Sequence, residues 1–245
     1  MNLKNKIAVI TGATGKLGSA FALELAKAGC HCICHYNKNK SKADNLLTEI
    51  GKHSVKAIAV QADLTKLEQI EDLFENTKKI GMPQILINSA GIFEETSLED
   101  ITQPQAQKHF DINVTAALLT SKAFAENLKN INCSDIRGKI INISDIGGIR
   151  PWANYSLYCS CKAALIGLTK SLAKELAPNI LVNAVAPGVA TWPYEMTDEE
   201  KKRQLGFIPM GRFAEKKEVA AAMMFLLEND YITGQTLVID GGRTI

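Results

Sequence analysis

Three side chains with complementary proton chemistry occur close together in the second half of the sequence: Asp145, Tyr158 and Lys162. Residues four apart share one face of a helix, so the Lys162 ammonium is expected beside the Tyr158 phenol. A nearby cation favours phenolate and lowers the tyrosine pKa from about 10, which suits proton transfer near neutral pH. An ionised Asp145 has the opposite effect, and it accepts hydrogen bonds but cannot donate one to a carbonyl oxygen. The three residues predict a site that transfers protons.

Length and composition set the class of protein. The chain has 245 residues, of which 46% are hydrophobic and 22% charged, as expected for one globular domain with a large core. Its net charge of +2 gives no electrostatic reason to expect nucleic acid or membrane partners. No apolar run is long enough to span a bilayer, and the first strand begins near Lys6, so we expect a cytoplasmic protein. The six cysteines lack the spacing of a zinc site, and no metal is predicted.

Strand-like and helix-like segments alternate along the whole chain. This alternation predicts one α/β domain over residues 1–245, a doubly wound parallel sheet of about seven strands with helices on both faces. The strands are expected at Ile7–Thr11, His31–Tyr36, Ala57–Gln61, Ile85–Asn88, Lys139–Ile143, Leu181–Ala184 and Thr236–Ile239. The helices are expected at Lys16–Ala28, Ser41–Ile50, Leu67–Lys79, Gln105–Asn130, Ser156–Leu176 and Lys217–Leu227. Ligands of such sheets bind beyond the carboxyl ends of the strands.

A glycine-rich turn follows the first predicted strand and opens the first helix. It runs from Thr11 to Gly18 and reads TGATGKLG, so that its candidate cofactor-binding residues are Gly12, Gly15, Lys16, Leu17 and Gly18. Glycines let the backbone approach a ligand closely, and a helix N-terminus attracts a pyrophosphate. Lys16 is either part of this site or a solvated lysine at a helix start. Between a strand and a helix, the turn predicts a Rossmann-type dinucleotide site.

The end of the second strand distinguishes the two nicotinamide cofactors. His35 and Tyr36 are followed by Asn37 and Lys38, and no acidic residue occurs before Asp44. An NAD site usually has an acidic residue here to accept the ribose hydroxyls, whereas a basic, donor-rich turn suits a 2′-phosphate. An exposed basic loop is the alternative. We favour NADPH.

Together these motifs resemble the short-chain dehydrogenase/reductase superfamily, over nearly the whole chain. Most members have serine where this chain has Asp145, and Asp145, Lys16 and Phe93 together resemble its pteridine reductase-like branch. The resemblance implies catalytic roles for Asp145, Tyr158, Lys162 and Asn113, the last holding a water in a proton relay. It implies cofactor contacts at Asp63, Leu64, Asn88, Ala90, Gly91, Tyr158, Lys162, Pro187 and Gly188. It also implies that Phe93 stacks on a pterin, that Trp192 borders the substrate with Asp145 and Tyr158, and that the protein is a homotetramer. Residues 190–212 form a candidate substrate lid.

Three functions are compatible with the sequence. The first is an NADPH-dependent pterin or dihydropterin reductase with Tyr158 as proton donor. The second is an NADPH-dependent carbonyl reductase such as a 3-oxoacyl-carrier-protein reductase, which the loss of the usual serine disfavours. The third is a non-catalytic NADPH-binding sensor, which the intact Asn113, Tyr158 and Lys162 disfavour. For Asp145 itself, the alternative to a catalytic role is that the residue is tolerated and pairs with Arg150.

Overall fold

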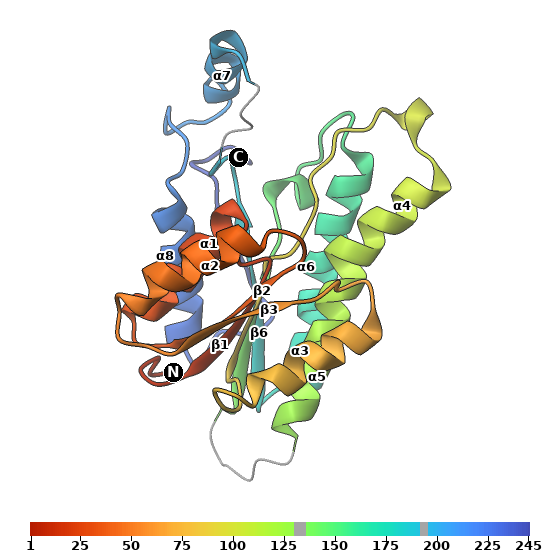
Figure 1. Ribbon diagram of the computed structural model, residues 1–245. Coiled ribbons are helices and arrows are strands. Elements are labelled where there is room, and N and C mark those ends of the chain that lie inside the picture. The colour runs from red at the N-terminus through yellow and green to blue at the C-terminus, as the bar shows by residue number, and fades with distance from the viewer. Residues whose placement is uncertain (130–135, 192–195) are drawn as a thin grey trace.

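A seven-stranded, wholly parallel sheet forms the centre of the protein, as predicted (Figure 1). The computed structural model describes residues 1–129, 136–191 and 196–245. The sheet has the order β3-β2-β1-β4-β5-β6-β7, in which the chain reverses direction across the sheet between β1 and β4. Its strands are β1 Ile7–Thr11, β2 His31–Tyr36, β3 Ala57–Gln61, β4 Ile85–Asn88, β5 Gly138–Ile143, β6 Ile180–Pro187 and β7 Thr236–Ile239.

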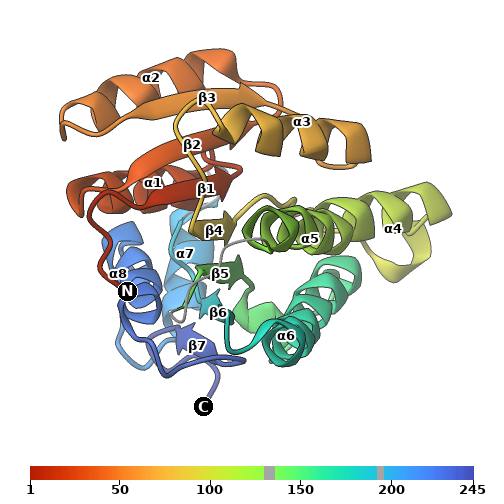
Figure 2. The same ribbon diagram turned by 90° about the horizontal axis from the view of Figure 1, so that it is seen from below.

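Helices cover both faces of this sheet (Figure 2). One layer contains α1 Lys16–Lys27, α2 Lys40–Gly51 and α8 Lys216–Glu228, and the other contains α3 Leu67–Thr77, α4 Gln103–Phe110, α5 Ala116–Leu128 and α6 Ser156–Leu176. Because helices cover both faces of the sheet, successive residues of a strand point into different hydrophobic cores. Ala8 and Ile10 belong to the α1 and α8 side, while Val9 belongs to the α3 and α5 side.

The cysteines of β2 follow the same alternation. Cys32 and Cys34, together with Cys30 just before the strand, are buried in the core under α1 and α8. They are free thiols, and burial raises the pKa of Cys30 and of Cys34 to about 12. These three residues therefore act as small core side chains, in line with their predicted positions on one face of the strand.

Two predicted elements differ from the structure. The single helix expected at Gln105–Asn130 is divided into α4 and α5 by a π-helical turn, η2 Asp111–Thr115. Such turns insert one residue into a helix and are frequent at functional sites, and this one carries Asn113. The strand expected at Leu181–Ala184 extends to Pro187, because Ala184 through Pro187 pair with β7. Both differences arise from tertiary contacts that local patterns do not encode.

Short elements complete the carboxyl edge of the sheet, where the motifs converge. They are the 3-10 helices η1 Leu98–Asp100 and η3 Ile146–Gly148 and the exposed helix α7 Asp198–Leu205. Beneath that edge, Asn88 at the end of β4 donates to Asn142 of β5 (2.9 Å), and the Thr120 hydroxyl of α5 donates to Asn88 Oδ1 (2.8 Å). This buried network fixes the ends of the two central strands relative to α5.

Two further predictions concern membrane spans and metal sites. None of the helices in residues 1–129, 136–191 and 196–245 is long and apolar enough to cross a membrane. Within the same ranges, no group of histidine, cysteine and acidic side chains has the arrangement of a metal site.

Candidate active site

A direct hydrogen bond joins Tyr158 to Asp145. The Tyr158 hydroxyl, on the first turn of α6, donates to Asp145 Oδ2 at 3.0 Å. The other carboxylate oxygen, Oδ1, accepts from the backbone N–H of Gly147 at 2.7 Å, so Asp145 caps the short helix η3 that follows β5. The carboxylate is therefore held by its own loop while it holds the phenol.

Lys162 lies one helical turn beyond Tyr158 and is buried. Its ammonium donates to the carbonyl oxygen of Ile143 at 2.9 Å and lies 5.6 Å from the centroid of the Tyr158 ring. Burial lowers the pKa of Lys162, an effect that the charge of Asp145 partly offsets. The predicted helical pair is present, with the lysine beneath the tyrosine ring.

The pKa values of these three residues differ from the sequence-based expectation for Tyr158. The pKa of Tyr158 lies well above its ordinary value, first because the phenol is buried and next because Asp145 is its neighbour and acceptor. The expectation that Lys162 lowers the pKa of this phenol is wrong for this arrangement, because burial and the carboxylate outweigh the cation. Burial also raises the pKa of Asp145, although the Gly147 amide and the charges of Lys162 and Arg243 oppose that rise. Tyr158 consequently keeps its proton.

Asn113 joins this group from the π-helical turn. Its Oδ1 accepts from the backbone N–H of Ile92 at 3.1 Å. Its Nδ2 is buried and has no hydrogen-bond partner among the described residues, so both of its N–H donors remain available. Gly91 keeps the space between Asn113 and Lys162 open, since a Cβ there would lie 2.7 Å from Asn113 Oδ1 and 3.7 Å from Lys162 Nζ. Asn113 is thus placed beside Lys162, while its water-holding role stays a prediction.

Aromatic rings surround the phenol, and only one of them was anticipated from the sequence. Phe93 is 51% exposed, stacks on Tyr155 with ring centroids 4.9 Å apart, and meets the edge of Tyr158 at 4.8 Å. Trp152 lies nearly parallel to Tyr158 at 6.4 Å. Phe93 is therefore not a core residue. Tyr155, three positions before Tyr158, was recognisable by its helical spacing, whereas Trp152 carried no sequence signal.

A hydrogen-bonded loop supports Phe93. Glu95 accepts from the Tyr155 hydroxyl at 3.1 Å, and the backbone N–H of Thr96 donates to the carbonyl of Asn154 at 2.7 Å. Burial and Glu95 raise the pKa of Tyr155 to about 12. The segment that carries Phe93 is thereby tied to the residues that precede α6.

The glycine-rich turn has the form of a dinucleotide cradle. Gly12 has a φ of +62°, and a Cβ at this position would lie 2.8 Å from the Cα of Ala90. A Cβ on Gly18 would lie 2.3 Å from the carbonyl oxygen of Gly12. Gly15 caps α1 without a side chain, no acidic residue occurs in the first turn, and Lys16 and Leu17 begin the helix. Close backbone approach at a helix N-terminus fits a pyrophosphate.

His35 has a positioning role in this cradle. Its ring is buried between the turn and β3, with Nδ1 accepting from the Gly12 N–H at 3.0 Å and Nε2 lying 2.9 Å from the Ala62 carbonyl oxygen. This pattern requires the proton on Nε2, and burial lowers the pKa of His35, which keeps the ring neutral. The structure shows His35 holding the backbone, while a direct cofactor contact remains a prediction.

The end of β2 presents the predicted basic turn. Tyr36 is buried at the strand end, and Asn37 and Lys38 are exposed beyond it. Asp63, after β3, accepts from the backbone N–H and the hydroxyl of Thr65 at 3.0 and 2.8 Å, and these bonds lower its pKa. Asp63 therefore caps its own turn, which does not exclude a contact with adenine. Leu64 beside it is buried.

The remaining predicted cofactor residues lie on loops at the carboxyl edge of the sheet. Ala90 and Ser89 donate their backbone N–H groups to the Thr11 hydroxyl at 3.1 and 3.0 Å, which joins the loop after β4 to the glycine-rich turn. Pro187 ends β6, and the N–H of Gly188 donates to the Ile239 carbonyl at 2.8 Å. Trp192 lies outside the described residues. The described part of the candidate lid includes the exposed helix α7, and its closure stays a prediction.

The proposed pairing of Asp145 with Arg150 is not what the structure shows. Arg150 donates to the backbone carbonyl of Arg243 at 3.2 Å, and Asp145 has Tyr158 and Gly147 as its partners. Arg243 approaches Asp145 closely enough for its charge to lower the carboxyl pKa. The arginine near Asp145 therefore comes from the C-terminal segment.

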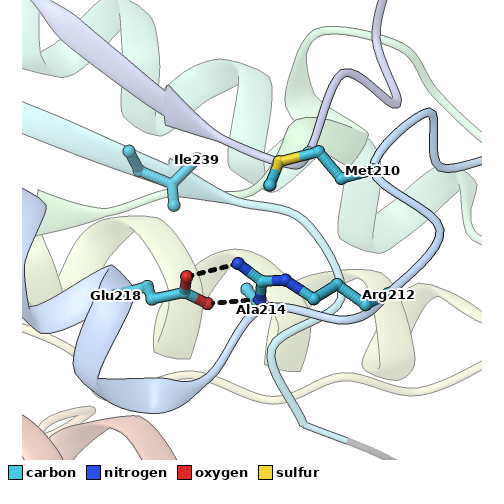
Figure 3. A pocket seen from close by; sticks show the side chains of 6 residues that line it. Met210, Arg212, Ala214, Glu218 and Ile239 are labelled. Atoms are coloured by element: carbon cyan, nitrogen blue, oxygen red, sulfur yellow. Dashed lines mark hydrogen bonds and ion pairs between the residues drawn. The ribbon is translucent and has the colours of Figure 1, made fainter.

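A small hollow of about 100 Å³ lies between the end of β7 and the start of α8 (Figure 3). The Arg212 guanidinium in it points to Glu218 and forms a two-bond ion pair, with one N···O distance of 2.6 Å and the other 2.8 Å. Its size and internal charge balance do not suit a substrate.

Comparison with known proteins agrees with this geometry. The family model described as enoyl-(acyl carrier protein) reductase matches residues 12–244. A 3-oxoacyl-[acyl-carrier-protein] reductase of Synechocystis is 36% identical over 249 residues, covering 99% of this chain and 98% of that protein. The chain belongs to the short-chain dehydrogenase/reductase superfamily. It is an NAD(P)-dependent oxidoreductase of this superfamily.

Solved structures of superfamily members have the same fold over their whole length. A double mutant of a short-chain dehydrogenase/reductase from Serratia marcescens superposes with a TM-score of 0.92 at 26% identity, covering 100% of both chains. A short-chain dehydrogenase from Burkholderia cenocepacia in complex with NADP gives 0.91 at 30% identity, again covering 100% of both. The relative from Synechocystis is not a pteridine reductase, so the comparisons support the carbonyl-reductase alternative better than the pterin prediction.

Proposed function

We propose that the protein is an NADPH-dependent carbonyl reductase that acts on 3-oxoacyl thioesters or similar β-keto compounds, with Tyr158 as the proton donor. The observation that carries the proposal is the buried Tyr158 hydroxyl, 3.0 Å from Asp145 Oδ2 and beside Lys162. The relative from Synechocystis, whose name states the reduction of 3-oxoacyl groups, supports the substrate class.

The cofactor fits the residues that are present. The glycine-rich turn and the acid-free start of α1 would hold the pyrophosphate, and Asn37 and Lys38 would bind the 2′-phosphate. When bound, NADPH supplies the hydride for the carbonyl carbon. The residues of the chain provide binding, orientation and the proton.

The proton comes from the phenol. In the reaction the substrate oxygen replaces Asp145 Oδ2 as the acceptor of the Tyr158 hydroxyl, the O–H bond of the phenol breaks and a new O–H bond forms on the substrate. The phenolate that remains is stabilised by the Lys162 cation beneath the ring. Before that step, burial and Asp145 keep the phenol protonated. Asp145 thus anchors the phenol at the position where most superfamily members have serine.

Purified protein tests this function directly. We expect NADPH oxidation with acetoacetyl-CoA, and a much lower rate with dihydrobiopterin at the same concentration. Turnover of dihydrobiopterin without turnover of the thioester would contradict the proposed substrate class.

Cofactor choice needs its own measurement. We expect kcat/KM to be higher for NADPH than for NADH, and the Lys38→Glu substitution to lower the NADPH value by roughly tenfold or more, the effect of losing a charge-assisted bond to phosphate. Lys78→Glu, the same charge change at the far end of α3, serves as the control and should have no effect. An unchanged NADPH preference in Lys38→Glu would remove this residue from the phosphate site.

A pterin reductase is the second candidate, favoured by one feature of the site. The exposed Phe93 ring lies 4.8 Å from the Tyr158 ring, so a flat heterocycle could stack on it above the proton donor. For that function we expect Asp145→Ser to lose most pterin turnover while NADPH binding persists. Unchanged pterin turnover in this variant would exclude Asp145 from pterin reduction.

A further inference from the structure

A pocket of about 400 Å³ opens beside the catalytic group. It lies between η3, the C-terminal segment and the segment that follows α7, and its walls include Ile146, Arg150, Trp152, Phe207 and Arg243. Ile146 follows Asp145 in the chain, and Trp152 lies 6.4 Å from the Tyr158 ring. Its volume is in the range of small-ligand sites. Through Ile146 and Trp152 the pocket adjoins the residues that contact Tyr158, while Asp145 and Tyr158 themselves are not among its lining residues.

Two arginines line the pocket, and none of its described lining residues is an aspartate or a glutamate. The Arg243 guanidinium lies between two aromatic rings, 5.9 Å from the centroids of both Trp152 and Phe207. The two arginines adjoin each other, because Arg150 Nη1 donates to the Arg243 carbonyl at 3.2 Å. These contacts with two aromatic rings help to hold the Arg243 side chain in place at the wall of the pocket.

Arg243 has hydrogen-bonding capacity that the described residues do not use. Its Nη2 donates to Gln204 Oε1 at 2.7 Å, whereas its Nη1 is buried without a hydrogen-bond partner in residues 1–129, 136–191 and 196–245. A buried donor without an acceptor is costly, the more so when it is charged. Burial lowers the pKa of Arg243, the charges of Asp145 and Asp240 oppose that effect, and the neighbouring charge of Arg150 adds to it. An anionic group in the pocket would accept a hydrogen bond from Nη1 and would favour the charged form of Arg243.

The two nearby aspartates are already engaged. Asp240 accepts from the Gly242 N–H at 2.9 Å and from the N–H and hydroxyl of Thr244 at 2.8 and 2.7 Å. Asp145 accepts from Tyr158 and Gly147. Neither carboxylate forms a hydrogen bond with an arginine of the pocket. Arg212, by contrast, is paired in two bonds with Glu218 (Figure 3).

We propose that the pocket binds a carboxylate or phosphate group of the substrate through Arg243 and Arg150, so that the enzyme prefers keto compounds with an anionic group a few bonds from the reacting carbonyl. This inference rests on the proposed carbonyl reduction and adds a specificity site to it. The shared chemistry is a planar or tetrahedral oxyanion that accepts charge-assisted hydrogen bonds from guanidinium groups.

Two ketoesters of matched shape test the preference. Ethyl 3-oxohexanoate is neutral, and the monoethyl ester of 3-oxoadipate has a carboxylate in place of its terminal methyl group. We expect the wild-type KM for the carboxylate compound to be on the order of tenfold lower, since a hydrogen bond to a charged group contributes about 1.5 kcal/mol or more. Arg150→Gln should remove this difference by raising the KM of the carboxylate compound alone, and Arg150→Lys should restore part of it.

Controls separate this inference from the proposed function. Arg150 is the variant of choice because Arg243 adjoins Asp145 and is more deeply packed. Arg212→Gln makes the same charge change at a paired arginine and should leave both KM values unchanged. Equal wild-type KM values for the two ketoesters, or a preference that persists in Arg150→Gln, would overturn the inference while reduction of the neutral ketoester would uphold the proposed function.

A binding measurement covers the case in which neither ketoester is reduced, which would count against the proposed function alone. Calorimetry of the NADP-loaded protein with adipate and with inorganic phosphate measures anion binding in the pocket without turnover. The anion that binds more tightly shows whether the pocket prefers a carboxylate or a phosphate group. We expect binding to the wild type that weakens about tenfold in Arg150→Gln. Absence of heat from both anions would overturn the inference.

Discussion

The Tyr158 hydroxyl donates its hydrogen bond to Asp145, whereas Lys162, four residues further along α6, donates to the backbone carbonyl of Ile143. The phenol is therefore coupled directly to an anion and only through space to the cation. Burial and Asp145 raise the pKa of Tyr158 well above its ordinary value. Because of this pairing, the Tyr158 phenol retains a proton that it can donate to a substrate.

Loss of the phenol hydroxyl should affect the chemical step and leave cofactor binding intact. For Tyr158→Phe we expect kcat to fall by roughly 10²- to 10⁴-fold, the usual contribution of a positioned general acid. The NADPH dissociation constant, measured by nucleotide fluorescence, should stay within about twofold of wild type because the pyrophosphate site lies at the start of α1. A variant with wild-type kcat would show that another group supplies the proton.

Phe93 should contribute to substrate binding through its exposed face. Phe93→Ala removes stacking worth about 1 kcal/mol and should raise the substrate KM roughly fivefold to tenfold. Leu98→Ala is the matched control, because Leu98 is a large apolar side chain that is 81% exposed on η1. Steady-state kinetics of both variants decide the point, and equal KM values in the two would rule out a role for the Phe93 ring.

Gly12 should be indispensable to the cofactor cradle. Gly12→Ala forces a side chain into a backbone with φ of +62° and to within 2.8 Å of the Ala90 Cα. The conformational cost alone is about 1–3 kcal/mol. We expect a lower melting temperature and NADPH binding weakened by tenfold or more. Gly51→Ala, with open space around its Cβ at the end of α2, should change neither quantity. Equal melting temperatures and equal NADPH affinities in the two variants would contradict a role for Gly12 in cofactor binding.

Much of the fold and of the site could be predicted from the sequence, because the responsible patterns are local. Runs such as Ile7–Thr11 are bounded by turn residues, and the i,i+4 spacing of Tyr158 and Lys162 fixes them on one helical face. The π-helical turn at Asn113 could not be predicted, since it depends on how α4 and α5 pack beside β4. The effect of Asp145 on the pKa of Tyr158 was expected, whereas the larger effect of burial escaped prediction, because the depth of burial depends on the whole fold.

The residues around the substrate site also depend on contacts that the sequence does not reveal. Phe93 was expected to contact substrate by resemblance alone, and its exposure beside Tyr155 and Tyr158 gives that expectation a physical basis. Arg243 was not among the predicted site residues. Its place between Trp152 and Phe207 joins segments that are far apart in the sequence, a contact that no local pattern specifies. The tetramer remains a prediction.

The most direct test of the account is the pH dependence of kcat/KM in the wild type and in Asp145→Ser, measured with the same ketoester up to about pH 11, beyond the ordinary pKa of a phenol. A phenol whose pKa is raised keeps its proton below that pKa, so activity is lost as pH rises through it. Removing the carboxylate takes away one cause of the rise and should move the alkaline decline to lower pH, while wild-type activity stays level through about pH 10. The same alkaline decline in both proteins would show that Asp145 does not hold the Tyr158 proton.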